Sequence, residues 1–274
     1  MLKERERPTE EFFTAWQNLW DEAARAGLVS APDTVPPADE PRWTDAQWLA
    51  FADMQEAAGL TAFPSMIRAA DCARPPGVSI SVFMRELQAG GWRRSNTVTQ
   101  FAARLRAGGL DMAKSLTAHK DDHGVDMVGV RAWLHAPASV LFLWGEGDGK
   151  THLANGAAIE FMRTTGRAAN FLRFSKFINQ MGEISDKERN EFYHAVCGVA
   201  LLILDALDAE EPSGWSQEAL LTILTARGDA GLPTIVTAEA APDDVLLARE
   251  DEPEAEAAIR AVMFTEKTVV MEVK

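Results

Sequence analysis

The chain has 274 residues, enough for one larger and one smaller domain, and its 47% apolar and 25% charged residues are ordinary for a globular protein. Its formal net charge of −14 argues against a protein that coats nucleic acid through an overall basic surface, but leaves room for a local basic patch. The distant Cys72 and Cys197 fit no metal or redox spacing and indicate reduced structural thiols. The first residues are too charged for a signal peptide, and no apolar run approaches the roughly 18 residues of a membrane helix. The sequence therefore predicts a cytoplasmic protein without membrane contact.

Residues 1–41 are predicted to form one helix followed by a proline-rich linker. Thr9 can cap a helix over residues 9–27, whose apolar face would pack on the rest of the chain or on a partner. Four prolines with acids between them indicate a linker over residues 30–41.

Residues 42–120 are predicted to form a small helical domain. Helices are expected over residues 44–58, 63–73, 79–89 and 96–107. A glycine-containing turn over residues 90–95, with Ser95 or Asn96 as the following cap, is typical of a helix-turn-helix or winged-helix unit. The side chains expected to contact DNA are Arg93, Arg94, Thr97, Gln100 and Arg104.

The charge of this region differs from that of the whole chain. Between residues 62 and 120, nine Lys or Arg residues stand against three acids. Clustered basic and small polar side chains at a helix start suit contact with phosphates and a groove. A solvated helical face, or a docking surface for an acidic protein, explains the same pattern.

Residues 121–274 are predicted to form a doubly wound α/β domain with a parallel sheet, since apolar runs alternate with helical segments. Strands are expected over residues 140–144, 168–174, 200–205, 233–238 and 268–273. Helices are expected over residues 125–136, 150–166, 175–184, 186–196, 213–227, 243–249 and 251–261. Ligands of such folds bind at the carboxyl ends of the strands, where the glycine-rich turn after Trp144, Asp205 and Thr237 all fall.

The glycine-rich turn has the layout of a phosphate-binding P-loop: a strand, glycines, Gly-Lys-Thr and a helix. Gly145, Gly147 and Gly149 would let backbone N–H groups point at phosphate, while Lys150 would reach the terminal phosphates and Thr151 would ligate Mg2+. The alternative is a strand–helix turn that happens to be rich in glycine.

The turn departs from the motif in two ways. Only three residues separate Gly145 from Gly149, so the loop is one residue short of Gly, four residues, Gly-Lys-Thr. Glu146 and Asp148 also stand where the backbone should meet phosphate oxygens, and like charges a few Å apart repel by about 1 to 4 kcal/mol.

With these motifs, the chain resembles the AAA+ ATPases of the DnaC/IstB kind, the replicative-helicase loaders and transposition helpers. The resemblance covers roughly residues 125–274 and is carried by residues 141–154, 200–210, 215–220 and 232–237. It implies an ATP site with Mg2+ on Thr151 and Asp205. It further implies that the nucleotide is bound by Gly145, Gly147, Gly149, Lys150, Thr151, His152, Asp205 and Thr237. Arg260 stands about where the family has its trans-acting arginine finger, or is a solvated helix arginine.

Several positions depart from the family pattern. Ala206 follows Asp205 where the family has an acid that polarises the attacking water, Glu239 stands near the place of a polar sensor, and Gly231 replaces a frequent arginine. Little chain remains for a helical lid. Loss of the water-orienting group should slow phosphoryl transfer by orders of magnitude, unless Asp208 or Glu210 replaces it, so ATP hydrolysis is predicted to be very weak or absent.

Three functions fit these observations. The first is a DnaC/IstB-like protein of DNA replication or mobile-element transactions that binds ATP and assembles with DNA, with a partner helicase or transposase, or with copies of itself. The second is a degenerate scaffold or adaptor that binds no nucleotide. The third is an active, DNA-stimulated ATPase with displaced catalytic groups.

Overall fold

The computed structural model describes residues 44–57, 59, 62–75, 77–83, 92–118, 127–137, 139–147, 149–209 and 211–273. The helix predicted over residues 9–27 and the proline-rich linker lie outside these ranges. Within them, no helix is long and apolar enough to cross a membrane.

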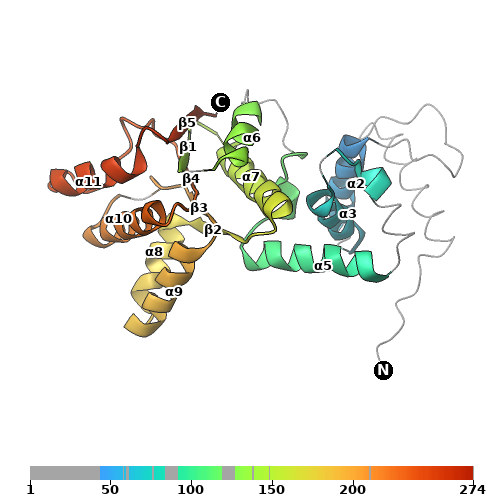
Figure 1. Cartoon of the computed structure of the whole chain (residues 1–274), viewed down its shortest axis with the longest axis horizontal. Helices are drawn as coiled ribbons and strands as arrows, with labels where there is room; N and C mark the ends of the chain where they lie inside the picture. The colour runs from blue at the N-terminus through green and yellow to red at the C-terminus, as the bar shows by residue number, and fades with distance from the viewer. Residues whose placement is uncertain are drawn as a thin grey trace, which may run out of the picture.

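The N-terminal part is helical, as predicted (Figure 1). It contains α2 (Asp45–Ala57), α3 (Ala62–Ala73), a helical segment over residues 80–83, α5 (Trp92–Ala107) and the short 3-10 helix η1 (Met112–Lys114). Phe51, Ile67 and Ile80 are fully buried between the first three of these.

The predicted turn over residues 90–95 is wrong from Trp92 onwards, because α5 begins there and not after a cap at Ser95 or Asn96. Residues 92–95 contain no glycine, proline or β-branched residue to break the helix, and arginine is a strong helix former.

Five parallel strands form the sheet of the C-terminal part, in the order β2-β3-β4-β1-β5. The strands are β1 (Val140–Trp144), β2 (Ala169–Arg173), β3 (Leu201–Asp205), β4 (Thr234–Ala238) and β5 (Val269–Glu272). The helices are α6 (Met127–His135), α7 (Gly149–Thr165), α8 (Phe174–Glu183), α9 (Asp186–Gly198), α10 (Gly214–Asp229) and α11 (Pro253–Met263). The predicted α/β class and parallel sheet are confirmed.

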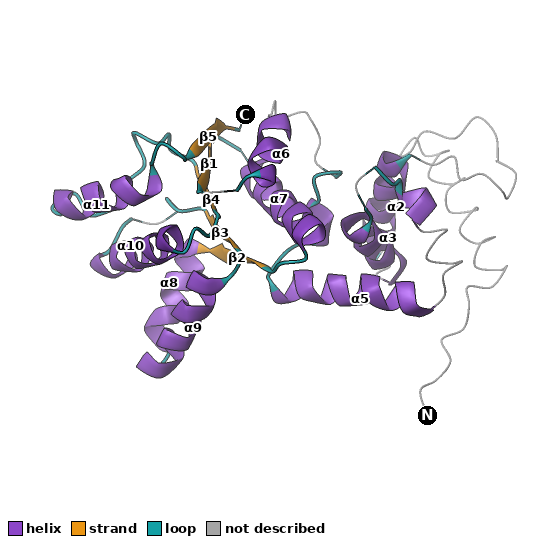
Figure 2. Cartoon of the chain, viewed as in Figure 1, coloured by secondary structure: helices purple, strands orange, loops and turns teal. Residues whose placement is uncertain are grey.

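Helices cover both faces of the sheet, so two cores form (Figure 2). Leu141 and Leu143 of β1 point into the core beneath α6 and α7, whereas Phe142 points into the core beneath α8, α10 and α11. Strands buried on both faces need continuous apolar sequence, which is what β1, β3 and β4 have.

The short helix predicted over residues 243–249 is not formed. Residues 242–244 make a turn and the chain then runs irregularly. The backbone N–H groups of Leu247 and Ala248 donate to the Glu256 carboxylate at 2.9 and 2.7 Å, and that of Arg249 donates to Gln217. Side-chain acceptors thus replace the helical hydrogen bonds of this segment.

A connector over residues 111–116 fastens the helical part to α7. Asn155, 2% exposed, accepts from the Asp111 backbone N–H at 2.9 Å and donates to the carbonyls of Asp111 and Lys114 at 2.7 and 3.1 Å. Gly156 lies so close to Leu116 that a Cβ atom would come within 2.8 Å of its backbone nitrogen. Cys72 and Leu105 belong to the same core as α7. The helical part therefore packs on the face of the sheet that carries α7.

Candidate nucleotide site

The loop between β1 and α7 requires glycine at two positions. Gly145 has a φ of +132°, and a Cβ atom there would lie 2.2 Å from the carbonyl oxygen of Val273, whose N–H donates to Trp144 at 2.7 Å. Gly147 has a φ of +100° with open space around it. The first glycine therefore allows the end of β5 to approach the loop, and the second supplies only the backbone conformation.

Lys150 closes the loop on itself. Its Nζ donates to the carbonyls of Gly145 at 2.5 Å and Gly147 at 2.7 Å, and the side chain is buried. A phosphate that recruited this ammonium group would have to compete with two charge-assisted hydrogen bonds to the backbone. The loop carbonyls thus occupy the lysine in the way that the phosphate oxygens of a nucleotide would in a P-loop.

Asp205 joins three elements at the carboxyl edge of the sheet. Its Oδ1 accepts from the hydroxyl of Thr151 at 2.8 Å and from that of Thr237 at 2.9 Å, and Asp205 is 3% exposed. The predicted Mg2+ residues are therefore adjacent. One carboxylate and one hydroxyl suit Mg2+, which takes its remaining ligands from phosphates and water. Within the described ranges, no group of three or more His, Cys, Asp or Glu residues could hold a metal by itself.

The turn after Asp205 has no free acid for water activation among the described residues. Ala206 adopts a left-handed φ of +52°, and its N–H donates to Thr237 Oγ1 at 2.9 Å. The carboxylate of Asp208 accepts from the backbone N–H groups of Glu239 and Ala240 at 2.8 to 3.1 Å. Asp208 therefore fixes the loop after β4. Glu210, the other predicted substitute, and Asp148 lie outside the described residues.

His152 and Arg260 make other contacts. The Nε2 of His152 lies 3.0 Å from the carbonyl oxygen of Ser115, in the connector. The guanidinium of Arg260 donates to the carbonyls of Pro242 and Val245 at 2.6 and 2.8 Å and pairs with Glu256 at 2.6 Å. These bonds hold the irregular segment after β4 against α11, and an arginine finger would have to give them up.

The predicted DNA contacts are described only in part. Gln100 and Arg104 are exposed on α5, and the Arg104 guanidinium donates to the carbonyl of Gly166 at 2.6 Å. The side chains of Arg93, Arg94 and Thr97 lie outside the described part of the structure.

The sequence did not indicate the contacts of two residues: Asn155 was not singled out, and Asp208 was considered only as a substitute for the missing acid. Asn155 stands alone as a polar residue in the apolar run of α7, which is a pattern that could have indicated a buried contact. Asp208 carries no such pattern, because its partners lie more than thirty residues further along the chain.

The sequence profile described as the bacterial DnaA ATPase domain matches residues 129–251. This segment runs from within α6 to just before α11 and includes the P-loop-like turn, Asp205 and Thr237. Over this segment, the predicted resemblance to AAA+ ATPases is therefore confirmed as a similarity to the bacterial DnaA ATPase domain. Comparison with curated proteins gives no match.

Solved structures match part of this chain at low identity. A replication initiator DnaA bound to AMPPCP and single-stranded DNA is 18% identical with a TM-score of 0.45, over 55% of this chain and 46% of that chain. A DnaC helicase loader is 23% identical with a TM-score of 0.44, over 54% of this chain and 87% of that chain. A putative primosome component from Streptococcus pyogenes is 22% identical with a TM-score of 0.47, over 60% and 90%. This chain therefore spans less than half of the DnaA chain that it matches.

Proposed function

Taking residues 129–251 as an AAA+-like ATPase domain, we propose that the chain is a DnaC/IstB-like protein of DNA replication or mobile-element transactions. It binds ATP with Mg2+ weakly and hydrolyses ATP very slowly or not at all. In this proposal, the binding of nucleotide supports assembly with partners, and assembly does not depend on its hydrolysis.

The observation that carries the proposed weak binding of ATP is the hydrogen bonding of Lys150. Its ammonium group already donates to the loop carbonyls of Gly145 and Gly147. Binding to phosphate would break these charge-assisted hydrogen bonds, so the net gain in free energy is only the difference between the lysine–phosphate and the lysine–carbonyl bonds. Glu146 and Glu239 are exposed at the same edge of the sheet and add like charge to a triphosphate. Affinity for ATP should therefore be low.

Slow hydrolysis is supported by the turn after β3. Phosphoryl transfer depends on positioning the attacking water and balancing charge. Ala206 offers no side-chain acceptor, and the Asp208 carboxylate is bonded to two backbone N–H groups. Ala206 therefore cannot orient water through its side chain, and Asp208 could do so only if the loop after β4 rearranged.

DNA is proposed to contact the helical part, on α5. Arg104 and Arg106 are exposed there, and residues 92–118 hold five Lys or Arg residues against one acid. In contrast, residues 205–256 hold fourteen Asp or Glu residues against two arginines, which would repel phosphates. In Figure 1 the acidic α11 lies to the left of the sheet and α5 to its right, so DNA would approach from the side that carries α5. A helicase, a transposase or a second copy would then bind elsewhere on the chain.

A thermal-shift series with ATP, ADP and Mg2+ tests nucleotide binding. A bound nucleotide at a hundredfold excess over its dissociation constant stabilises the fold by roughly 2.7 kcal/mol. We expect a melting-temperature rise only at millimolar ATP, dependent on Mg2+ and absent in Lys150→Ala. The absence of any rise would contradict nucleotide binding and favour the alternative of a scaffold that binds no nucleotide.

Salt-titrated binding to a labelled duplex and a labelled single strand tests the DNA contact. Replacing Arg104 and Arg106 with alanine should weaken binding and reduce the dependence of log K on log salt by about 2. Arg249→Ala, which changes an exposed arginine on the acidic side, is the matched control. Equal binding by both variants would contradict the α5 contact.

A further inference from the structure

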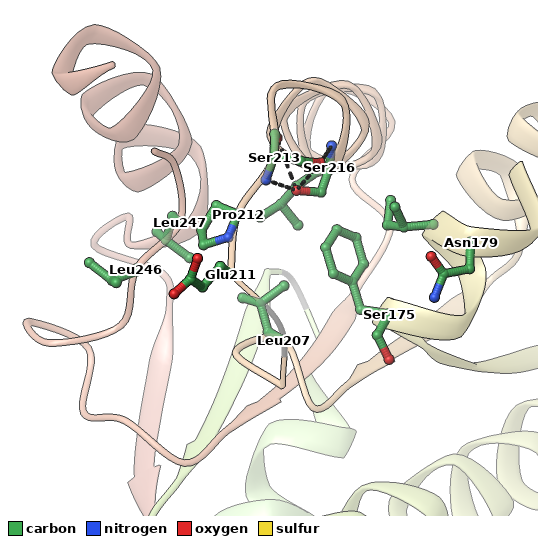
Figure 3. Close-up of a pocket in the computed structure, with 12 residues that line it drawn as sticks. Ser175, Asn179, Leu207, Glu211, Pro212, Ser213, Ser216, Leu246 and Leu247 are labelled. Atoms are coloured by element: carbon green, nitrogen blue, oxygen red, sulfur yellow. Dashed lines mark hydrogen bonds between the residues drawn. The ribbon is translucent and has the colours of Figure 1, made fainter. Parts of the chain in front are cut away.

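A pocket opens on the face of the sheet opposite α7, where α8, the start of α10 and the irregular segment after β4 meet (Figure 3). Its buried lining is apolar, with Phe174, Leu207, Leu220 and Leu247 each no more than 7% exposed. Leu246 stands at the rim and is 54% exposed, which makes it one of the most exposed large apolar side chains in the described part of the chain.

The volume of the pocket, about 270 Å3, limits what it can hold. Pockets for whole small molecules usually measure about 300–1,000 Å3. A smaller apolar hollow with one exposed leucine at its rim fits a single bulky apolar side chain, as hot-spot residues do in protein–protein interfaces.

The polar groups around the opening are of two kinds. Ser213 and Ser216 bond to each other in the capping box of α10, so their hydrogen-bonding capacity is largely used within the helix start. For the Glu211 carboxylate, in contrast, the described residues supply neither a hydrogen bond nor an ion pair, and Figure 3 shows this carboxylate beside Leu246 and Leu247. Among the described residues, the opening thus presents a carboxylate without a partner next to an apolar surface.

The surrounding surface is strongly acidic. Of the two arginines among residues 205–256, Arg227 is 1% exposed and Arg249 is paired with Asp251. Asp243, Asp244 and Glu250 are exposed in the segment that carries Leu246. Acids thus outnumber cations in this stretch, although Lys176 of α8 is exposed beside Ser175 of the lining, and the excess favours a cationic partner over nucleic acid.

We propose that this pocket is a docking site for a partner protein segment in which a bulky apolar side chain is flanked by Lys or Arg. The apolar side chain fills the hollow above Leu207 and Phe174, and a flanking cation pairs with Glu211. Leu207 lies two residues after Asp205, and its N–H donates to the carbonyl of Thr237, so an occupant contacts the turn that completes the nucleotide site. The site needs no bound nucleotide.

Fluorescein-labelled five-residue peptides titrated into the full chain test the proposal by anisotropy. The probe has a central phenylalanine between two lysines on each side, and the matched peptides replace phenylalanine with alanine or the lysines with aspartate. We expect saturable binding of the phenylalanine peptide at least about tenfold tighter than that of the alanine peptide, since a hot-spot anchor carries most of the energy. The aspartate peptide should not bind.

Two surface variants locate the binding. Leu246→Ser and Glu211→Lys should each weaken the phenylalanine peptide about tenfold, as expected for a rim contact and a charge pair. Val270→Ser and Glu218→Lys change an exposed valine and an exposed acid that do not line the pocket, and should leave the affinity unchanged. Equal binding of the phenylalanine and alanine peptides, equal effects of pocket and control variants, or no saturable binding would overturn the proposal.

Discussion

The Thr151 hydroxyl donates a hydrogen bond of 2.8 Å to Asp205 Oδ1, which joins the first turn of α7 to the end of β3. The same oxygen accepts from Thr237 at the end of β4. One buried carboxylate therefore connects the three elements that would surround a nucleotide's phosphates, and it does so with the protein's own hydroxyl groups.

Asp205→Ala should destabilise the fold by roughly 1–3 kcal/mol, because both threonine hydroxyls lose their buried acceptor. Urea denaturation measures this loss as a lower midpoint at an unchanged slope. Asp205→Asn keeps an acceptor oxygen and should cost less. If the asparagine variant were as unstable as the alanine variant, the hydrogen-bonding role assigned to this oxygen would be wrong.

Gly145→Ala should cost more stability than Gly147→Ala, although both glycines have positive φ. The strain of a non-glycine residue in such a sparsely populated backbone conformation costs roughly 1–3 kcal/mol at either position. At Gly145 the added Cβ also meets the Val273 carbonyl oxygen at 2.2 Å, and overpacking of this kind costs about 1–3 kcal/mol more. Equal midpoints for the two variants in urea denaturation would show that β5 does not press on the loop.

The sequence was sufficient to predict those features of the fold that depend on local patterns of residues. Continuous apolar runs predicted β1, β3 and β4, and their carboxyl ends predicted that the glycine-rich turn, Asp205 and Thr237 would lie at one edge of the sheet. Contacts between distant segments could not be predicted in this way. The segment over residues 243–249 has helical composition, but Glu256 takes its N–H groups. From the sequence alone Asp208 is a candidate for catalysis, but its carboxylate accepts from two backbone N–H groups of the loop after β4.

Asn155→Ala should loosen the connector between the helical part and α7. The substitution leaves the Asp111 N–H and two carbonyls without their partner, which costs about 2 kcal/mol. Hydrogen exchange should then rise at residues 111–118 more than in β1 or β3. Asn179→Ala, which changes an exposed asparagine of α8, is the control. Unchanged exchange at the connector would contradict the role of Asn155.

Cys72 should react with a thiol reagent at pH 8 far more slowly than Cys197. Burial raises the pKa of Cys72 well above that of a free thiol and raises that of Cys197 as well, but Cys72 is 1% exposed whereas Cys197 is half-buried. The thiolate is the reactive form, so a raised pKa and burial both protect Cys72. Single-cysteine variants, Cys197→Ala and Cys72→Ala, separate the two rates. Fast labelling of Cys72 in native protein would mean that α3 leaves α7 readily.

The raised pKa values of the two thiols determine whether the stability of the fold rises or falls with pH. A thiol whose pKa is raised in the folded state keeps its proton after the unfolded thiol has ionised, so its contribution to stability is complete below the unfolded pKa and is lost as pH rises above it. Stability should therefore fall at alkaline pH, and less steeply in Cys72→Ala. Urea midpoints between pH 7 and pH 10 measure this, and an equal decline in both proteins would exclude Cys72 as the cause.

Ala206→Glu should not restore ATP hydrolysis. It would return a carboxylate to the place where the family polarises water, and turnover of about 10 per second is typical of enzymes, with each tenfold loss equal to about 1.4 kcal/mol of barrier. However, Lys150 would still be bonded to Gly145 and Gly147, and Glu146 and Glu239 would still repel the phosphates. Effects within one site act as a unit and do not add, so a single repair rescues nothing measurable. Phosphate release by the variant, compared with Ala206→Gln as its uncharged match, measures this. Turnover in Ala206→Glu alone would show that one missing acid is the only defect, and hydrolysis by the unmodified chain that Lys150→Ala abolishes would refute the weak-turnover proposal as a whole.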